Sequence, residues 1–476
     1  MTSVPTGATG PAFDPIASAF DYARWMGQCA EVWSTGLLDP AAIAAKAGRR
    51  LTALVDFARS HSAFYRDAYQ KVPHRGWRLD TLPPLAKSEL MARFDDWVTD
   101  PQVTRRQVED FIADPVRIGA PYLNGYSVWT SSGTTGVPGL YVQSAEALAT
   151  YDALTTIRFG TAGTPPDHLV RSAMSAGRAV LIAAIDRHYA GIASWQRLRR
   201  RNPYLAAGSR SVSVMAPLTQ IVATLNDFRP AFVSSYPSVL AQLAQEHAEG
   251  RLNIEPAALW TGGEFLSESS QLRIERQFGC QVINEYGASE CMSIGFGCRE
   301  GWLHVNSDWV ILEPVDRHHR PVAPGVESFT TLLTNLANRL QPVIRFDLGD
   351  SITVKPQPCA CGNRFPAIRV MGRHDDILEM KAPGGRIVQV LPIALTTAVE
   401  EAADLHRFQI VRKNRSTLLV RLEVPAPRSC DEAWRQARDA LGGYLARIGL
   451  PGIAIEFDPL APAVHPRSGK LRQVIA

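Results

Sequence analysis

The sequence of 476 residues lacks any apolar run of the roughly 18 residues that a helix needs to cross a bilayer. Its N-terminus also lacks a charged region followed by an apolar stretch, so no secretory signal is visible. Cysteine is scarce, and seven cysteines in a chain of this length do not make a disulfide framework. We therefore expect a cytoplasmic protein that does not associate with membranes.

An excess of charge of one sign is also missing. The 50 basic residues are nearly balanced by 46 acidic ones, which leaves a formal net charge of +4. The sequence contains no basic stripe interleaved with aromatic residues, so nothing in it predicts nucleic-acid binding. Hydrophobic residues at 46% and charged residues at 20% are ordinary values for a globular protein with an ample core.

The patterns that are present divide the chain into three parts. Over about residues 1–110, apolar residues recur at three- and four-residue spacing and predict a helical leader. From about residue 127, short apolar runs alternate with amphipathic helices, which favours an α/β fold with doubly wound, parallel sheets. The last part predicts a small α+β module. We expect an N-terminal domain over 1–372 and a C-terminal domain over 373–476.

One loop between two apolar runs has the composition of an anion site. In "WTSSGTTGVPG" (129–139), hydroxyls and backbone N–H groups are available to a phosphate, and the glycines allow close approach. Phosphate loops usually carry a lysine, but Val137 stands at the expected place. By itself the segment is either a phosphate loop or a Ser/Thr-rich turn. Its candidate binding residues are Ser131, Ser132, Gly133, Thr134, Thr135 and Gly136.

Four further motifs follow this loop in a fixed order. They are "NEYGASE" (284–290), "IRFDLGD" (344–350), "GRHDD" (372–376) and "HPRSGKLRQV" (465–474). In this order and spacing the chain resembles the adenylate-forming acyl ligases, and in particular the phenylacetate–CoA ligase branch, a resemblance that covers about residues 50–474. It implies an enzyme that uses ATP to adenylate a carboxylic acid, releases pyrophosphate, and then transfers the acyl group with release of AMP.

The resemblance also implies roles for individual residues. The Ser/Thr/Gly loop would hold the β- and γ-phosphates of ATP, and Glu290 would hold Mg²⁺. Lys470 would stabilise charge between the carboxylate and the α-phosphate, and Arg373 would contact ribose or phosphate. The C-terminal domain would be a mobile lid with its hinge at Asp375. The remaining nucleotide-binding residues would be Gly262, Gly263 and Glu264 beside the adenine, Tyr286 against it, Gly287, Ser289 at the α-phosphate, and Asp350 at the ribose hydroxyls.

Two pairs of soft ligands predict a structural metal site. Cys298 lies six residues from His304, and about 55 residues later Cys359 and Cys361 form a C-x-C pair. Three thiolates and one imidazole suit a closed, tetrahedral Zn²⁺ site, which leaves no open position for catalysis. The alternative is a group of reduced thiols packed in the core.

The acid and the acyl acceptor are less defined by the sequence. The resemblance puts Tyr236, Ser238, Gly262, Ala288 and Met292 around the acid, and small residues beside aromatic ones suit an aryl or arylacetic acid. Core packing explains the same residues. CoA is the expected acceptor, with an amine or a carrier protein's phosphopantetheine as alternatives. A non-catalytic nucleotide-binding homologue is the other alternative, and the oligomeric state, a homodimer included, is left open.

Overall fold

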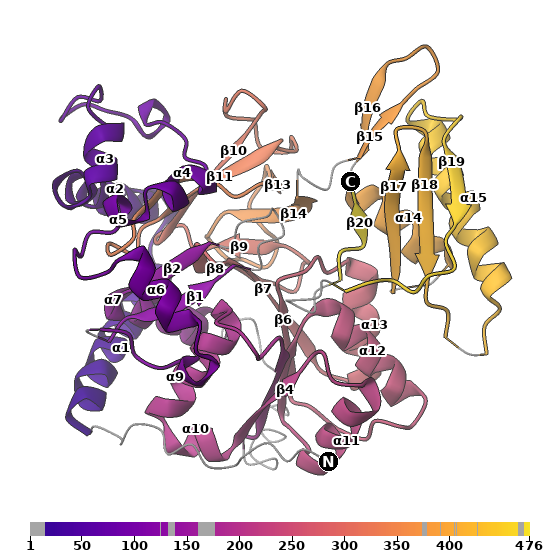
Figure 1. The fold of residues 1–476 in the computed structure, drawn as a ribbon, viewed down its shortest axis with the longest axis horizontal. Helices are drawn as coiled ribbons and strands as arrows, with labels where there is room; N and C mark the ends of the chain where they lie inside the picture. The colour runs from indigo at the N-terminus through magenta and orange to yellow at the C-terminus, as the bar shows by residue number, and fades with distance from the viewer. Residues whose placement is uncertain are drawn as a thin grey trace.

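The computed structural model describes residues 15–123, 125–131, 139–159, 177–373, 378–390, 392–403, 405, 407–425, 427–464 and 471–476 (Figure 1). Several predicted residues lie outside these ranges, namely Ser132 to Gly136, Val137, Asp375 and Lys470. Over the described ranges no helix combines the length and apolar character that crossing a membrane requires.

Helices form the N-terminal part of the molecule. Asp39 and Thr104 begin two of them, because each side chain accepts a hydrogen bond from a backbone N–H of the first turn. Apart from the first, these helices pack around a large apolar core that includes Trp97 and Trp129. The helices are α1 (Pro15–Gly36), α2 (Pro40–His61), α3 (Ala63–Ala68), α4 (Lys87–Ala92), α5 (Phe94–Trp97) and α6 (Arg105–Ile112), with short turns η1 (Leu79–Thr81) and η2 (Pro115–Arg117).

The central element is a nine-stranded mixed sheet with the order β13-β14-β9-β8-β7-β6-β5-β3-β4. Its strands are β3 (Ala179–Ala183), β4 (Ser209–Ser213), β5 (Phe232–Ser235), β6 (Ala258–Gly262), β7 (Gln281–Ala288), β8 (Cys291–Gly297), β9 (Leu303–Val305), β13 (Asp350–Val354) and β14 (Ala367–Arg373). The strands from β4 to β7 are parallel, as predicted, but β7, β8, β9, β14 and β13 pair antiparallel. The α/β class was predicted correctly, but the expected parallel pairing holds only for the half from β4 to β7.

Helices cover both sides of the parallel half (Figure 1). One side carries α11 (Leu218–Phe228), α12 (Pro237–Ala248) and α13 (Glu268–Phe278). The other carries α9 (Ala190–Arg201) and α10 (Pro203–Ala207). A helix α7 (Ala145–Leu154), continued by the wider turn η3 (Thr155–Phe159), packs against α1.

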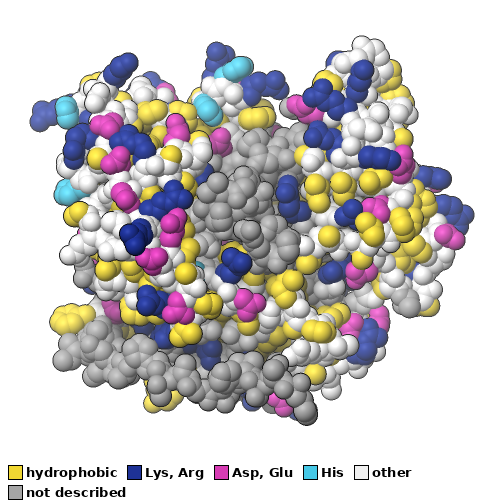
Figure 2. All heavy atoms as spheres, in the orientation of Figure 1, with side chains coloured by type: hydrophobic (Ala, Val, Ile, Leu, Met, Phe, Trp, Pro, Cys, Tyr) yellow, Lys and Arg dark blue, Asp and Glu magenta, His cyan; other side chains and the backbone are white. Residues whose placement is uncertain are grey.

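Two smaller antiparallel sheets complete this part of the chain. β1 (Ser127–Thr130) and β2 (Leu140–Gln143) form a hairpin, and β10 (Val310–Val315), β11 (Thr330–Asn335) and β12 (Val343–Asp347) form a three-stranded sheet. The hairpin is fully buried, so its position relative to the core is fixed by packing on both faces. On the face of the molecule in Figure 2, basic and acidic side chains are interspersed.

A separate apolar core lies in the C-terminal part. Its four-stranded mixed sheet has the order β19-β18-β17-β20, with β17 (Phe408–Asn414), β18 (Thr417–Leu422), β19 (Ala454–Phe457) and β20 (Val474–Ile475). A hairpin of β15 (Leu378–Lys381) and β16 (Ile387–Val390) precedes it, and α14 (Pro392–Ala403) packs on α15 (Cys430–Arg447). The exact boundary of the predicted lid stays a prediction, because residues 374–377 lie outside the described ranges.

Candidate active site

A cavity of about 1550 Å³ lies at the carboxyl ends of the parallel strands, between the large sheet and the C-terminal part. Ligands bind at this edge of α/β sheets because the loops that follow the strands converge there. The predicted nucleotide-binding residues that line the cavity are Ser131, Gly262, Gly263, Glu264, Tyr286, Gly287, Ser289 and Asp350. Glu290 also lines it.

The base of the Ser/Thr/Gly loop is closed by backbone contacts. The N–H of Ser131 donates to the carbonyl of Gly139 at 3.0 Å, and the N–H of Gly139 donates to the Ser131 hydroxyl at 2.8 Å. The indole N–H of Trp129 donates to the carbonyl of Ser289 at 2.7 Å. The loop therefore starts from a buried hairpin that is fastened directly to the "NEYGASE" segment.

A lysine that was not predicted from the sequence to lie at the site reaches this loop. Lys87, the first residue of α4, places its Nζ 2.9 Å from the Oγ of Ser131 and lines the same cavity. A lysine at the start of a helix is common, so the sequence alone offers little signal.

Arg345 fixes the position of the segment that carries Lys87. Its buried guanidinium donates to the carbonyls of Asp80, at 3.2 Å, and Leu82, and it forms an ion pair with Glu313 at 3.0 Å. The backbone of Leu85 also pairs with β12, through the carbonyl of Arg345 at 2.9 Å. Arg345 itself adopts a left-handed conformation with φ of 52°. A non-glycine residue keeps this conformation only where its surroundings hold it.

The predicted adenine and ribose residues contact one another. The hydroxyl of Tyr286 donates to Asp350 Oδ2 at 2.7 Å. Asp350 begins β13 and is paired in register with Arg373 at the end of β14, which brings the backbones of two predicted ribose residues together. Gly287 has a structural requirement as well, because a Cβ there would lie 2.0 Å from the carbonyl oxygen of Met292.

Glu290, the predicted magnesium ligand, lies at the turn between β7 and β8. It is buried, and the hydroxyl of Tyr141 on β2 donates to its carboxylate. Burial and the neighbouring carboxylate raise the pKa of Tyr141 well above its usual value, so this hydroxyl stays protonated and keeps donating. A carboxylate oriented in this way at a cavity wall offers the hard oxygen ligand that Mg²⁺ requires.

Glu264 connects the cavity to the C-terminal part. Its Oε2 accepts the N–H of Ser238 at the start of α12, at 3.1 Å, and its Oε1 accepts the N–H of Leu471 at 2.8 Å. Leu471 follows Lys470 in the chain. A second contact is made by Glu400 on α14, which accepts hydrogen bonds from Ser269 and Gln473, both at 3.3 Å. Burial raises the pKa of Glu400.

The predicted acid-binding residues Tyr236, Ser238, Gly262, Ala288 and Met292 all line the cavity. The lining residues that were not predicted include Trp260 on β6 and Glu285 on β7. The Trp260 indole N–H donates to Glu285 Oε2 at 3.0 Å. Burial raises the pKa of Glu285 to about 7, although its two hydrogen bonds, from Trp260 and Ser293, act in the opposite direction.

The four predicted metal ligands are brought together. The ligand atoms of Cys298, His304, Cys359 and Cys361 all lie within 4.8 Å of one another. Two of these separations are 3.8 Å, between the Sγ atoms of Cys298 and Cys359, and 3.2 Å, between Cys361 Sγ and His304 Nε2. A tetrahedral Zn²⁺ with usual bond lengths would separate its ligands by about 3.3–3.8 Å.

The surroundings of this cluster suit metal ligation. The buried His304 has its Nδ1 2.8 Å from the carbonyl oxygen of Phe365, so Nδ1 carries the proton and Nε2 faces the thiols. The N–H of Asn363 donates to Cys361 Sγ at 3.4 Å. Gly362 provides the tight turn, with φ of 83°. Burial and neighbouring thiols raise the pKa of Cys361 to about 12, a cost that a bound cation would offset.

Sequence comparisons give two similar curated proteins of one kind. The phenylacetate–coenzyme A ligase of Thermus thermophilus is 26% identical over 377 residues, which are 73% of this chain and 80% of the relative. The phenylacetate–coenzyme A ligase of Escherichia coli is 25% identical over 313 residues, or 62% of this chain and 65% of the relative. No family model matches the chain.

Among solved structures, a 2-hydroxyisobutyryl-CoA ligase in complex with 2-HIB-AMP aligns with a TM-score of 0.66 and 22% identity. The alignment covers 90% of this chain and 88% of that one. An open conformation of a 2-hydroxyisobutyryl-CoA ligase aligns with a TM-score of 0.55. The described parts of several of the ordered motifs line one cavity, and with these relatives the chain belongs to the adenylate-forming ligase superfamily and is similar to its phenylacetate–CoA ligases.

Proposed function

We propose that this protein is an AMP-forming acid–thiol ligase that activates a carboxylic acid with ATP and transfers the acyl group to CoA. The observation that carries the proposal is the contact between Glu264 and Leu471. It holds the residue next to Lys470 at a cavity that the predicted adenine, ribose and magnesium residues line. Segments far apart in the sequence have no packing reason to converge on one open cavity with so many polar groups.

In the first half-reaction, a carboxylate oxygen of the acid attacks the α-phosphorus of ATP, and pyrophosphate leaves. Asp350 and Tyr286 would hold the ribose and adenine, and Lys470 would stabilise the negative charge that builds between acid and phosphate. Glu290 would hold Mg²⁺, which neutralises charge on the phosphate oxygens. The contribution of the chain itself is to orient the two reactants in line.

We further propose that Lys87 supplies the positive charge that Val137 does not. Its Nζ already lies at the base of the phosphate loop, and Arg345 holds its segment rigidly against β12. An ammonium here stabilises the leaving pyrophosphate from outside the loop, while the loop contributes backbone N–H groups and hydroxyls. If Lys87 supplies this charge, Val137 in place of a loop lysine is no argument for a non-catalytic nucleotide-binding homologue.

In the second half-reaction, the thiol sulfur of CoA attacks the acyl carbonyl, AMP leaves, and the thiol proton passes to solvent or a nearby base. The contacts that join the large sheet's loops to the C-terminal part, Glu264 with Leu471 and Ser269 with Glu400, suit a lid that must separate and rotate about Asp375 after adenylation. The acid is an aryl or arylacetic acid in this proposal, in keeping with the relatives and with Tyr236 and Trp260 at the cavity.

We also propose a structural zinc ion held by Cys298, His304, Cys359 and Cys361. The donor set, the separations of the ligand atoms and the oriented imidazole fit a closed tetrahedral site. When bound, the ion would join the turn after β8 to the loop before β14. Because Cys298 and Cys361 also line the cavity, the site would stiffen one wall of it.

The test is acid-dependent exchange of pyrophosphate into ATP in the presence of Mg²⁺, over a panel of aryl, arylacetic and aliphatic acids without CoA. Exchange with one class of acid supports adenylation and defines the substrate class. CoA-dependent release of AMP then supports the thioester step, whereas release that depends on an amine or a carrier protein would replace CoA as acceptor. No exchange with any acid, despite measurable ATP binding, would overturn the proposal.

A further inference from the structure

Glu285 places a carboxyl group on the wall of the cavity where an acyl group would lie. Its strand β7 pairs in parallel with β6, with Glu285 opposite Gly262. Side chains alternate along a strand, so Glu285 and Tyr286 face opposite sides. Because Tyr286 reaches the predicted ribose residue Asp350, Glu285 faces away from the nucleotide end of the site.

The carboxyl has few partners. Trp260 Nε1 donates to Oε2 at 3.0 Å and Ser293 Oγ donates to Oε1 at 3.3 Å. A carboxylate offers about four acceptor positions, so these two bonds leave acceptor capacity toward the cavity. Across the described part of the chain, no lysine, arginine or histidine forms an ion pair with Glu285. A buried carboxylate without a counter-charge is unfavourable unless a ligand compensates it.

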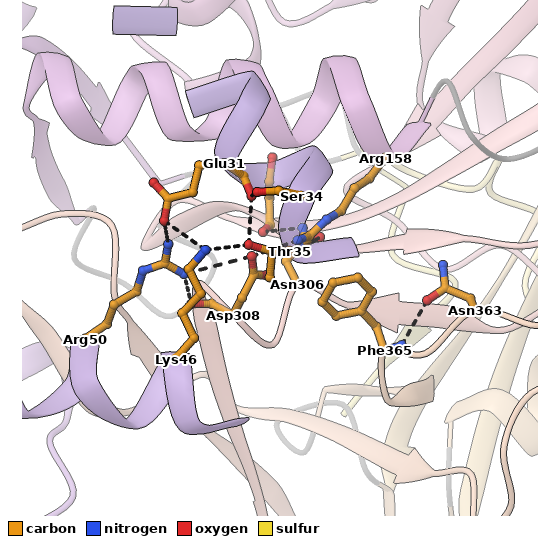
Figure 3. Close-up of polar contacts among 11 residues, drawn as sticks. Glu31, Ser34, Thr35, Lys46, Arg50, Arg158, Asn306, Asp308, Asn363 and Phe365 are labelled. Atoms are coloured by element: carbon orange, nitrogen blue, oxygen red, sulfur yellow. Dashed lines mark hydrogen bonds and ion pairs between the residues drawn. The ribbon is translucent and has the colours of Figure 1, made fainter. Parts of the chain in front are cut away.

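The partners of Glu285 are themselves held in place. Asn306 Nδ2 donates to the carbonyl of Ser293 at 2.9 Å, and Arg158 donates to Asn306 Oδ1 at 2.7 Å. Arg158 forms a fully buried ion pair with Asp308 at 2.8 Å. Arg50 on α2 extends this network to Glu31 on α1, and Figure 3 shows Arg50, Glu31 and Asp308 pointing toward one another. The Ser293 hydroxyl therefore holds Glu285 from a rigid base.

The rest of this wall is apolar or small. Phe296 on β8 is in register with Glu285 and lines the cavity, as do Met292 and Ala288. Gly262 must remain small, because a Cβ there would lie 2.8 Å from the carbonyl oxygen of Glu285. An apolar acid would fill this space but would leave the remaining acceptor positions of the Glu285 carboxyl without a hydrogen bond. Sites built to hydrogen-bond one substrate group reject analogues that lack it far more strongly than apolar pockets reject an extra methylene.

We propose that Glu285, with Trp260 and Ser293, is a specificity subsite for acids that carry a hydrogen-bond donor, a hydroxyl or an amino group, on the acyl part. This inference rests on the proposed adenylating function and narrows its substrate class. The donor bonds to the carboxyl of Glu285, while Phe296 and Met292 contact the carbon frame. Glu285 selects the acid and takes no part in the transfer of the adenylyl group.

The test measures pyrophosphate exchange with sets of acids that share one carbon skeleton and differ in a single substituent. Each set contains a parent acid, such as benzoic or phenylacetic acid, its hydroxy and aminomethyl derivatives, and the methoxy derivative as a control of similar size without a donor. We expect kcat/KM for at least one donor acid to exceed those of its parent and methoxy analogue about tenfold or more. The kcat/KM for an acid with a cationic aminomethyl group should rise as the pH increases through 7, because Glu285 then becomes ionised. The kcat/KM for an acid with a hydroxyl donor should not depend on the ionisation of Glu285.

Variants make the assignment specific. Glu285→Leu should lower kcat/KM for the preferred donor acid about tenfold or more and raise that for the parent acid, so that the preference disappears. Glu285→Gln, which keeps the shape and an acceptor oxygen, should retain the preference for hydroxyl but lose that for a cation. Glu255→Gln changes an exposed carboxyl and serves as the matched control.

The two proposals fail in different ways. Exchange that is equally efficient with parent, methoxy and donor acids would overturn the donor subsite and leave adenylation intact. The donor subsite would also be overturned if Glu285→Leu lowered kcat/KM for the parent acid and for the donor acid by the same factor. Absence of exchange with every acid would overturn adenylation itself.

Discussion

The backbone N–H of Leu471 donates to the carboxylate of Glu264 at 2.8 Å and so joins the last segment of the chain to the loop that follows β6. The same carboxylate accepts the N–H of Ser238. We expect Glu264→Ala to slow adenylation about 10- to 100-fold, because hydrogen bonds to a charged group contribute about 1.5–3 kcal/mol. Thioester formation from a supplied acyl-adenylate should change less.

Single-turnover measurements of the two half-reactions check this expectation. Glu264→Gln, which retains an acceptor oxygen, should lie between the wild type and Glu264→Ala. Equal losses in both half-reactions would show that Glu264 stabilises the whole fold and not one arrangement of the C-terminal part.

Lys87 provides a second prediction. Lys87→Met should raise the KM for ATP and lower kcat for pyrophosphate exchange, with a combined loss of about 10²-fold, because the leaving pyrophosphate loses a cation. Lys87→Arg should restore part of the activity. Lys71→Met, which removes an exposed lysine elsewhere in the leader, is the matched control and should leave exchange unchanged.

A second substitution should restore the activity that Lys87→Met removes. In the Lys87→Met background, Val137→Lys should recover much of the lost exchange, since a loop lysine is common in this family. If Lys87→Met keeps full activity, the ammonium of Lys87 only holds Ser131 in place and has no role in binding phosphate.

For Lys470 we expect a separation between binding and chemistry. Lys470→Ala should lower the rate of adenylation by about 10²–10³-fold, because it removes a charge that acts in the transition state. The Kd for ATP, measured by calorimetry, should change by only a small factor. Lys413→Ala, on the exposed face of β17 with Glu456 as partner, is the control. Unchanged adenylation in Lys470→Ala would refute the assignment.

The zinc site predicts about one equivalent of zinc per chain by elemental analysis after exhaustive dialysis. Cys361→Ser should lower this content and reduce the Tm by about 5 °C or more, because a closed metal site contributes directly to folding. Cys430→Ser changes an exposed cysteine outside the cluster and should do neither. A full-length wild-type protein that contains no transition metal, and whose Tm is insensitive to chelators, would contradict the proposal.

Glu285 should also affect the pH dependence of stability. Its pKa is about 7 in the folded protein, above the value of about 4.3 for an exposed glutamate. The folded state therefore binds this proton more tightly, and the free energy of unfolding decreases as the pH rises between these two values. Water in the cavity will reduce the size of this effect, because the carboxyl faces the cavity.

Chemical denaturation of the wild type and Glu285→Gln at pH 5 and pH 8 measures this contribution. We expect the wild type to lose more stability over this interval than the variant, by about 1–3 kcal/mol. Equal losses would mean that Glu285 has an ordinary pKa and is exposed to bulk water.

The parallel half of the sheet was predictable because each strand is followed at once by its helix. The segments 231–236 and 281–287 contain β5 and the start of β7, and α12 lies where the repeating apolar pattern indicates. The antiparallel half was not predictable from such local patterns. β14 pairs with β9 more than 60 residues earlier in the chain, and nothing in either short strand specifies that partner.

The candidate site also contains residues that could be predicted from local sequence patterns and residues that could not. The Cys/His cluster was predicted because metal ligands occur in close pairs that remain visible in the sequence. Lys87 was missed because its role depends on the distant anchor Arg345, and Glu285 was missed because the sequence does not show which face of a strand borders a cavity. The predicted roles of the site residues, those of Arg373, Asp375 and Lys470 included, stay predictions.

The anchoring of Lys87 by Arg345 has a consequence for engineering and for evolution. If the charge for pyrophosphate comes from the leader, this segment cannot be exchanged or shortened as an independent module. A chimera that takes its nucleotide loop from this protein and its leader from a chain without a lysine at this place would have neither lysine. Descendants of such a chain would have to preserve the arginine of "IRFDLGD" and the lysine of "LAKSEL" as a pair, although some 250 residues separate them.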